Sequence, residues 1–192
     1  IVTVDDAIDA IADETTRELY QMAGLDTDDR VTTPASMSVR RRLPWMTINL
    51  GTAILAATVV SLFEGTIGQV VALATFMPIV AGMGGNGATQ TLTVIVRAIA
   101  LGDLDFSTAR RAILREALVG VSIGVATGAM MAAVALLWKG NWVLGVVIGA
   151  ALIFNLLIGG LAGAIVPIVL KWLKIDPALG SSVIVTTFTD CF

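Results

Sequence analysis

Long apolar segments with short polar connections make up most of the chain after residue 42. A helix needs about 20 apolar residues to cross the hydrocarbon of a bilayer. Backbone polar groups in that hydrocarbon are satisfied only inside a helix or a closed barrel. We therefore expect an all-α membrane protein with five transmembrane helices, at about Leu43–Phe63, Gly68–Ala100, Ile113–Trp138, Trp142–Trp172 and Leu179–Phe192.

Two of these segments depart from the ideal length. The second is too long for one straight crossing, and Pro78 with the glycines that follow it predicts a kink or break there. The fifth is truncated, so we expect the chain to end inside a helix and the natural protein to continue past Phe192.

The composition agrees with this division. The chain is 56% hydrophobic and 14% charged, with a mean hydropathy of +0.88, whereas soluble domains have about 25% charged residues. Fourteen of the 27 charged residues lie in the first 42 positions, which predicts a short polar piece before the membrane domain. A net charge of −3 and the absence of histidine argue against nucleic acid as a partner and against a histidine-built metal site.

Residues 1–24 read as the end of a strand followed by an amphipathic helix with Asp5 as its N-cap and Gly24 at its end. Residues 25–42 read as a linker and juxtamembrane segment. A strand that begins at residue 1 has no partner, so we expect a preceding soluble domain. The apolar side of the helix consists of Ala7, Ile8, Ile11, Leu19 and Met22.

The positive charges of the loops predict the orientation. With a cytoplasmic N-terminus, nine cationic residues from position 40 onward lie inside and only Lys139 lies outside, as the positive-inside rule prefers. The localisation expected is therefore the plasma (inner) membrane, as a multi-pass protein in contact with lipid, with Glu64 at the outer mouth. The nine inner cations are Arg40, Arg41, Arg42, Arg97, Arg110, Arg111, Arg115, Lys171 and Lys174.

A polar stripe runs through the second apolar segment. Asn86, Gln90, Thr93 and Arg97 are spaced by four, three and four residues, so they share one face of a helix, and Thr89 adjoins them. One interpretation is hydrogen bonding between helices. The other is an oxygen-lined cavity for a hard cation.

Small residues directly precede this stripe. The glycines Gly84 and Gly85 let other backbones approach and expose their own carbonyl oxygens. Such backbone is tolerated at membrane depth where it lines a cavity or is buried in protein, so the glycines support the second interpretation.

Asp190 gives a sharper indication. It follows Thr186 and Thr187 by about one turn and lies about eleven residues, or ~16 Å, into its segment. A carboxylate near mid-membrane costs about 3 kcal/mol by insertion scales, which favours a role in an ion pathway. One carboxylate per chain compensates a divalent cation poorly, so we expect a homodimer with the pathway on its twofold axis.

Other features allow two readings. Asn155 either faces the pathway or hydrogen-bonds to a neighbouring helix. The regular glycines Gly120, Gly124 and Gly128 predict a close helix-packing face. The acids Asp9, Asp13, Glu14 and Asp176 would lie on the cytoplasmic side, where they form either an ordinary solvated surface or a divalent cation site.

Two long sequence stretches resemble a known family. PIVAGMGGNGATQTLTVIVRAIALGDLDF resembles the second-helix signature of the MgtE family of magnesium channels, and DPALGSSVIVTTFTD resembles the start of its fifth helix. The resemblance implies that residues 1–24 are the tail of a cytoplasmic CBS domain. It also implies that residues 25–42 are the connecting plug segment and residues 43–192 the transmembrane pore domain.

The resemblance also implies residue roles. Asp190 stands where the family binds hydrated Mg²⁺ in the pore, and Asn86, Thr89 and Thr93 stand in its pore segment. Asp176 matches an acid that pairs through regulatory Mg²⁺ with the CBS and plug region. In this chain, the acids that best match the acidic positions of the family's CBS region are Asp9, Asp13 and Glu14.

The expected function is therefore passive Mg²⁺ uptake. The alternatives within transport are a coupled transporter and a channel for another divalent metal, such as Mn²⁺ or Co²⁺. An intramembrane aspartyl enzyme would need a second intramembrane acid, and the sequence suggests none, so we expect no enzyme. A structural or sensor subunit would not require the polar stripe and Asp190.

Overall fold

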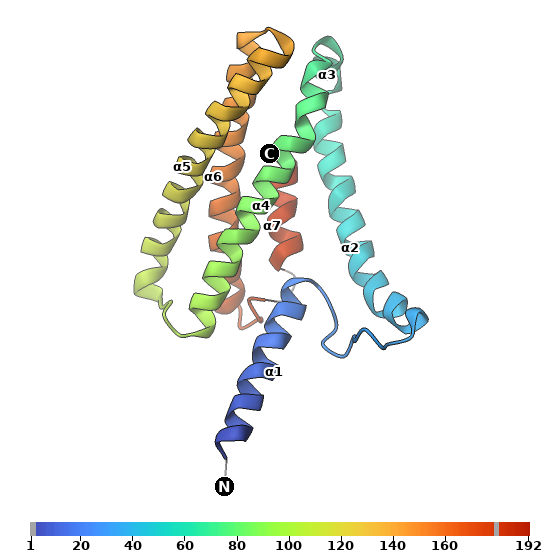
Figure 1. The fold of residues 1–192 in the computed structure, drawn as a ribbon, viewed down its shortest axis with the longest axis vertical. Coiled ribbons are helices and arrows are strands. Elements are labelled where there is room, and N and C mark those ends of the chain that lie inside the picture. Colours follow the sequence, from blue (N-terminus) through green and yellow to red (C-terminus); the bar gives the residue numbers. More distant parts are fainter. Residues whose placement is uncertain (1–2, 179–180) are drawn as a thin grey trace.

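The computed structural model describes residues 3–178 and 181–192, and in this part the chain is helical with no strand. The strand expected at the N-terminus falls mainly on residues 1 and 2, outside the described residues. Helices α5 and α6 lie side by side, whereas α2 and α4 meet near α3 and diverge toward the end of the molecule that carries α1 (Figure 1). The helices are α1 Val4–Met22, α2 Ala35–Ser61, α3 Glu64–Gln69, α4 Ala72–Ala100, α5 Phe106–Lys139, α6 Trp142–Trp172 and α7 Ser181–Cys191.

Within the described residues, three helices are long and apolar enough to cross a membrane: α2, the Thr108–Lys139 part of α5, and α6. The helix α4 has 29 residues but carries the polar stripe, and α7 has only 11 residues. The expectation of an all-helical membrane protein is thus confirmed, whereas five complete spans are not. The short helix α3 was not predicted.

Of the kink or break predicted at Pro78, the break does not occur there, and the helix is instead interrupted earlier, between α3 and α4. The α4 helix runs without interruption from Ala72 to Ala100, through Pro78 and the glycines that follow it. The side-chain amide of Asn155 on α6 donates a hydrogen bond to the carbonyl of Val80, 2.9 Å away. Packing against a neighbouring helix therefore supports α4 in the region where the sequence suggested a break.

The N-terminal helix is capped differently from the prediction. Its N-cap is Thr3, not Asp5: the Thr3 hydroxyl accepts from the amide of Asp6, and the Asp6 carboxylate accepts from the amide of Thr3. Such a capping box requires an accepting side chain three residues after the cap. Asp6 provides it for Thr3, whereas the residue three positions after Asp5 is the apolar Ile8. The end at Gly24 is confirmed, because its φ is +68° and its amide closes the last turn.

The segment expected to be a linker is partly helical. Pro34 is the N-cap of α2, so the arginine triplet at 40–42 belongs to this helix. Asp29 is buried at 3% exposure and ties the preceding loop to α2. Its carboxylate accepts from the Ser38 hydroxyl at 2.7 Å and from the Arg42 guanidinium at 2.8 Å. Those two hydrogen bonds, first the one from Ser38, lower the pKa of Asp29 below its ordinary value.

Helices α4 and α5 both pack against α6, and they pack little against each other. The regular glycines of α5 lie at its contact with α6: a Cβ atom on Gly120, Gly124 or Gly128 would come within 2.5–2.8 Å of the α6 backbone. The predicted helix-packing face is therefore confirmed, and α6 is the helix against which α4, α5 and α7 all pack.

Candidate ion pathway

The polar stripe of α4 lies on one exposed side of that helix. Asn86, Thr89, Gln90 and Thr93 are all exposed, and so is Arg97 in the last turn. The opposite side of α4 is buried against α6 and α7, through Ala88, Leu92, Ile95 and Val96 among others. The shared face that the spacing predicted is thus present. The single chain leaves it uncovered.

The threonine hydroxyls of this stripe are oriented by their own helix. Thr89 donates its hydroxyl hydrogen to the carbonyl of Gly85, and Thr93 donates to the carbonyl of Thr89, both at 2.9 Å. Because each hydroxyl hydrogen is used within α4, the oxygen lone pairs are the groups left for an outside partner. The stripe can therefore accept hydrogen bonds from water molecules, including those around a cation.

The two glycines predicted near the pathway have different surroundings. Gly84 is buried, and a Cβ there would come within 2.4 Å of the Asn155 amide oxygen. Gly85 faces α7, where a Cβ would meet Thr186 and Thr189 at 3.9 Å. Gly84 therefore lets α6 approach α4, while Gly85 lies at the contact between α4 and α7.

Asn155 itself is 2% exposed and hydrogen-bonded to α4. Of its two readings, hydrogen bonding to a neighbouring helix is the one that the structure confirms.

Asp190 lies in the last turn of α7 and is exposed. The preceding threonines are half-buried, and each donates its hydroxyl hydrogen within α7: Thr186 to Ser182 and Thr187 to Val183. Thr186, one turn before Asp190, is the residue that faces Gly85. Among the described residues, no side chain forms an ion pair with the Asp190 carboxylate, which is consequently available to a ligand.

A crevice of about 470 Å³ adjoins Asp190. Its walls come from the ends of α2 and α3, the first half of α4, the middle of α6 and the end of α7. Most of the lining is apolar, and its polar side chains are Asn155, Thr189 and Asp190. Thr189 is fully buried and hydrogen-bonds to Thr186, so Asp190 supplies the only charged side chain of this crevice within the described residues.

The predicted regulatory acids do not converge on one metal site. Asp9, Asp13 and Glu14 are exposed on α1, and in the described residues no three acids, cysteines or histidines are close enough to hold an ion. Glu18 of α1, which sequence analysis missed, lies near enough to Asp176 for their negative charges to repel each other. Burial raises the pKa of Glu18, and the charges of Glu14 and Asp176 raise it further.

Glu18 could have been found from its spacing, because it follows Glu14 by one helical turn. The last turn of α1 also contacts the membrane helices. Met22 packs against the cluster formed by Leu92, Val96 and Ala178, and its carbonyl accepts a hydrogen bond from Ser182 at 2.8 Å. At the other end of the molecule, Glu64 is exposed in the first turn of α3.

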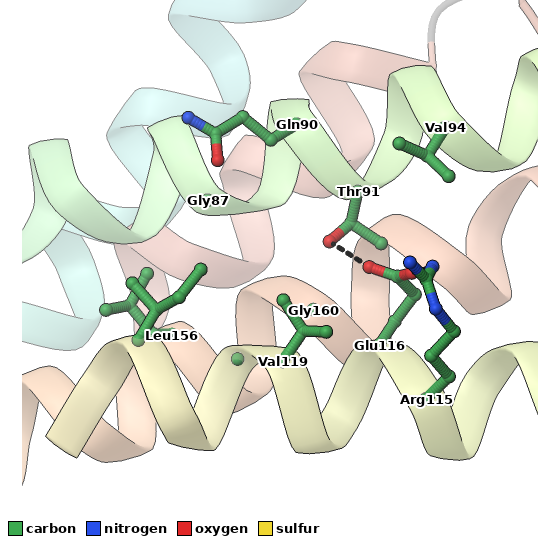
Figure 2. A pocket seen from close by; sticks show the side chains of 11 residues that line it. Gly87, Gln90, Thr91, Val94, Arg115, Glu116, Val119, Leu156 and Gly160 are labelled. Carbon is green, nitrogen blue, oxygen red and sulfur yellow. Dashed lines mark hydrogen bonds and ion pairs between the residues drawn. The ribbon is translucent and has the colours of Figure 1, made fainter. Parts of the chain in front are cut away.

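A second residue that sequence analysis missed is Glu116 on α5, which is 4% exposed. Its carboxylate accepts a hydrogen bond from Thr91 on α4 at 3.1 Å and forms an ion pair with Arg115 (Figure 2). These side chains line a pocket of about 180 Å³ between α4 and α5, to which Gln90 also contributes. Gln90 thus stands between the exposed stripe and this pocket.

The profile of one protein family matches residues 77–192. The family is MgtE, described as "Divalent cation transporter". The chain belongs to the MgtE family. The matched segment contains both the polar stripe of α4 and Asp190 of α7, and it agrees with the resemblance found in the sequence. The family description is that of transporters and not of enzymes.

Three curated relatives, each called "Magnesium transporter MgtE", agree with this assignment. The chain is 39% identical over 190 residues to the protein of Bacillus subtilis and 36% identical over 190 residues to that of Enterococcus faecalis. It is 33% identical over 192 residues to that of Thermus thermophilus. Each match covers 99% of this chain and 42% of the relative. The chain therefore spans less than half the length of these MgtE relatives.

Proposed function

We propose that this MgtE chain forms the membrane part of a Mg²⁺ transporter, with hydrated Mg²⁺ passing along the exposed stripe of α4 and the Asp190 carboxylate of α7. The observation that carries this proposal is the polar face of α4, which one chain leaves uncovered although Ala88, Leu92, Ile95 and Val96 bury the opposite side of the helix there. Facing hydrocarbon, the side-chain amides of Asn86 and Gln90 would lack partners, at a cost on the order of several kcal/mol each. A water-filled pathway avoids that cost.

A homodimer would supply the missing cover. A twofold axis beside α4 and α7 would bring two stripes and two Asp190 carboxylates together, so that the site carries a charge of −2 for a cation of +2. The relatives' name supports Mg²⁺ as the ion. Mn²⁺ and Co²⁺ remain the alternative cargo, because the same oxygen ligands suit them.

The chemistry of the stripe suits an ion that keeps its water. Mg²⁺ loses its hydration shell reluctantly and is usually bound with several waters in place. The outward lone pairs of Thr89 and Thr93 would accept hydrogen bonds from that shell, and Asp190 would attract it by charge. Uptake needs no further energy source, since a +2 ion gains about 4.6 kcal/mol per 100 mV of inside-negative potential. A coupled transporter is the alternative mechanism.

We also propose that Asp176 takes part in a regulatory Mg²⁺ site outside the hydrocarbon. The surroundings of Glu18 support this: burial raises its pKa first, and the negative charges of Glu14 and Asp176, which raise it further, are charges that a divalent cation would neutralise. The partners expected from the sequence were Asp9, Asp13 and Glu14, and Glu18 is now the first candidate. In this proposal residues 1–24 are the end of a cytoplasmic domain, residues 25–42 connect it, and residues 43–192 form the pore domain.

The orientation follows from the same proposal. A cytoplasmic N-terminus in the plasma (inner) membrane places α1 and the arginines of α2, α4 and α5 inside, in accord with the positive-inside rule. Helices α4 and α7 then serve as the second and fifth spans, lining the pathway within protein instead of facing lipid.

Cysteine cross-linking in the intact transporter tests the axial site. Asp190→Cys, in a Cys191→Ala background, should form a disulfide between two chains in the membrane. The control Val125→Cys, exposed on α5, should not. A cysteine at position 190 that reacts with thiol reagents but never links two chains would contradict the dimer axis.

A further inference from the structure

The pocket between α4 and α5 is a groove with a polar end. Val94 on α4 and Val119 and Ile123 on α5 form its apolar walls. Gln90, Thr91, Arg115 and Glu116 form its polar end. Val94 is 50% exposed and Ile123 is 39% exposed, so the groove opens at the surface of the single chain. Of the residues that line the groove, Gln90 alone also belongs to the polar stripe of the proposed pathway.

The groove exists because α4 and α5 both lie against α6. Three glycines form its floor with Leu156. A Cβ on Gly87 or Gly120 would come within 2.5 Å of Leu156, and one on Gly160 would come within 2.8 Å of the Glu116 carbonyl. The floor is therefore closed by tight contact, and the space between the walls stays open.

Arginine side chains gather at the polar end of the groove. The Arg115 side chain is 67% exposed, and its ion pair with Glu116 uses only part of its five N–H donors. Arg111 precedes Arg115 by one turn on α5, and Arg97 follows Val94 by three residues on α4; both are exposed. Because Thr91 and Glu116 are bonded and the two helices run in opposite directions, Arg97 and Arg111 lie toward the same end.

The position of these arginines along the membrane normal matches the level of the lipid phosphates. The 23 residues from Arg115 to the exposed Trp138 span about 35 Å at helical rise, slightly more than the ~30 Å of hydrocarbon. If Trp138 lies at one interface, where tryptophan is preferred, Arg115 lies at the level of the other. The apolar walls run from Arg115 toward mid-membrane.

We propose that this groove binds an anionic phospholipid, with one acyl chain between Val94, Val119 and Ile123 and the phosphate held by Arg97, Arg111 and Arg115. Charge complementarity selects the anionic class, because the exposed Arg115 lines this end, Arg97 and Arg111 lie about one helical turn beyond it, and the buried Glu116 is the one carboxylate of the lining. Basic pockets between membrane helices take such headgroups, and arginine matches phosphate through paired N–H donors. The lipid would occupy the space between α4 and α5 that no side chain fills.

Lipid titration of the delipidated intact transporter, followed by native mass spectrometry, tests the proposal. Dioleoyl phosphatidylglycerol should be retained at concentrations where dioleoyl phosphatidylcholine is not. Val119→Trp should fill the groove and weaken phosphatidylglycerol binding at least about five-fold, whereas Val125→Trp on another side of α5 should leave it unchanged. Arg111→Gln should weaken it about five-fold, the effect of one interfacial cation. The matched control Lys139→Gln, at the other end of α5, should not.

Three results would overturn the proposal. Equal retention of the two lipids would remove the charge recognition. Unchanged phosphatidylglycerol binding in Val119→Trp would show that no acyl chain lies in the groove. Complete displacement of the lipid by inorganic phosphate would show that the groove binds phosphate and not a lipid. Disulfide formation between two chains carrying Val119→Cys and Cys191→Ala would assign the groove to a second copy instead.

Discussion

Thr91 on α4 donates a hydrogen bond to the carboxylate of Glu116 on α5 across 3.1 Å, and both residues are buried. This hydrogen bond links α4 and α5, which both pack against α6 but make few contacts with each other. Thr91→Val keeps the shape of the side chain but leaves a buried carboxylate oxygen without its donor. We expect a loss of about 1–3 kcal/mol in the free energy of unfolding.

Thermal unfolding in detergent measures this loss. The control is Thr89→Val, two residues earlier on the exposed side of α4, which should change stability by less than about 0.5 kcal/mol. Equal effects of the two substitutions would show that the Thr91–Glu116 bond contributes nothing specific.

The contact between α5 and α6 should not tolerate a single added methyl group. A Cβ on Gly124 would lie 2.8 Å from the Cα atom of Ile153, a backbone atom that cannot move aside freely. Gly124→Ala should therefore destabilise the fold by about 1–3 kcal/mol. Gly51→Ala, on α2 with nothing within 4 Å, should be neutral or stabilising by up to about 1 kcal/mol. Denaturant unfolding of both variants checks the difference, and destabilisation of similar size in both would refute the packing argument.

The loop before α2 should detach at acid pH. The folded pKa of Asp29 is lowered from its ordinary value of 3.8, so its charged form is the one that the fold favours. The stabilisation is complete above that ordinary value and is lost as pH falls below it through the folded pKa. Hydrogen exchange of residues 26–33 should accelerate in that range.

Asp29→Asn should show fast exchange in this loop already at pH 7, because the Arg42 guanidinium then has no carboxylate to pair with. Slow exchange of the variant at pH 7 would mean that the buried carboxylate does not hold the loop.

The regulatory proposal predicts a separation of two activities. Asp176→Asn or Glu18→Gln in the intact transporter should leave Mg²⁺ flux present and weaken its inhibition by internal Mg²⁺. Ion flux into proteoliposomes, measured at several internal Mg²⁺ concentrations, tests this. Asp5→Asn serves as the control, because Asp5 is exposed in the first turn of α1, more than three turns before Glu18. Lost flux with unchanged inhibition would contradict the assignment.

Sequence patterns predicted those features that depend on one helix or on a repeated spacing. The polar stripe follows from intervals of four, three and four residues, and the contact at Gly124 follows from glycines every four residues. The unbroken course of α4 could not be predicted in this way. Asn155, 75 residues further along the chain, hydrogen-bonds to the carbonyl of Val80 near Pro78, and no local sequence pattern indicates that contact.

The missed residues have a tertiary cause. Glu116 follows Arg115 in the sequence and reads as the charged edge of a span, and its burial arises only because α4 approaches with Thr91. Asp29 likewise reads as a solvated linker acid, and it is buried because the loop folds back onto Ser38 and Arg42. In both cases the partner that explains the acid lies on another element, and hydrophobic periodicity does not indicate that element.

The central claim is that Asp190 and the α4 stripe carry hydrated Mg²⁺. Asp190→Asn keeps the size and hydrogen-bonding capacity of the side chain and removes its charge, whereas Thr93→Ala removes one hydroxyl that water can replace, worth about 1 kcal/mol. Mg²⁺ flux of the intact transporter is measured in liposomes with an imposed inside-negative potential. We expect Asp190→Asn to lose most of the flux and Thr93→Ala to lose far less. Flux in Asp190→Asn equal to that of the parent would contradict this account.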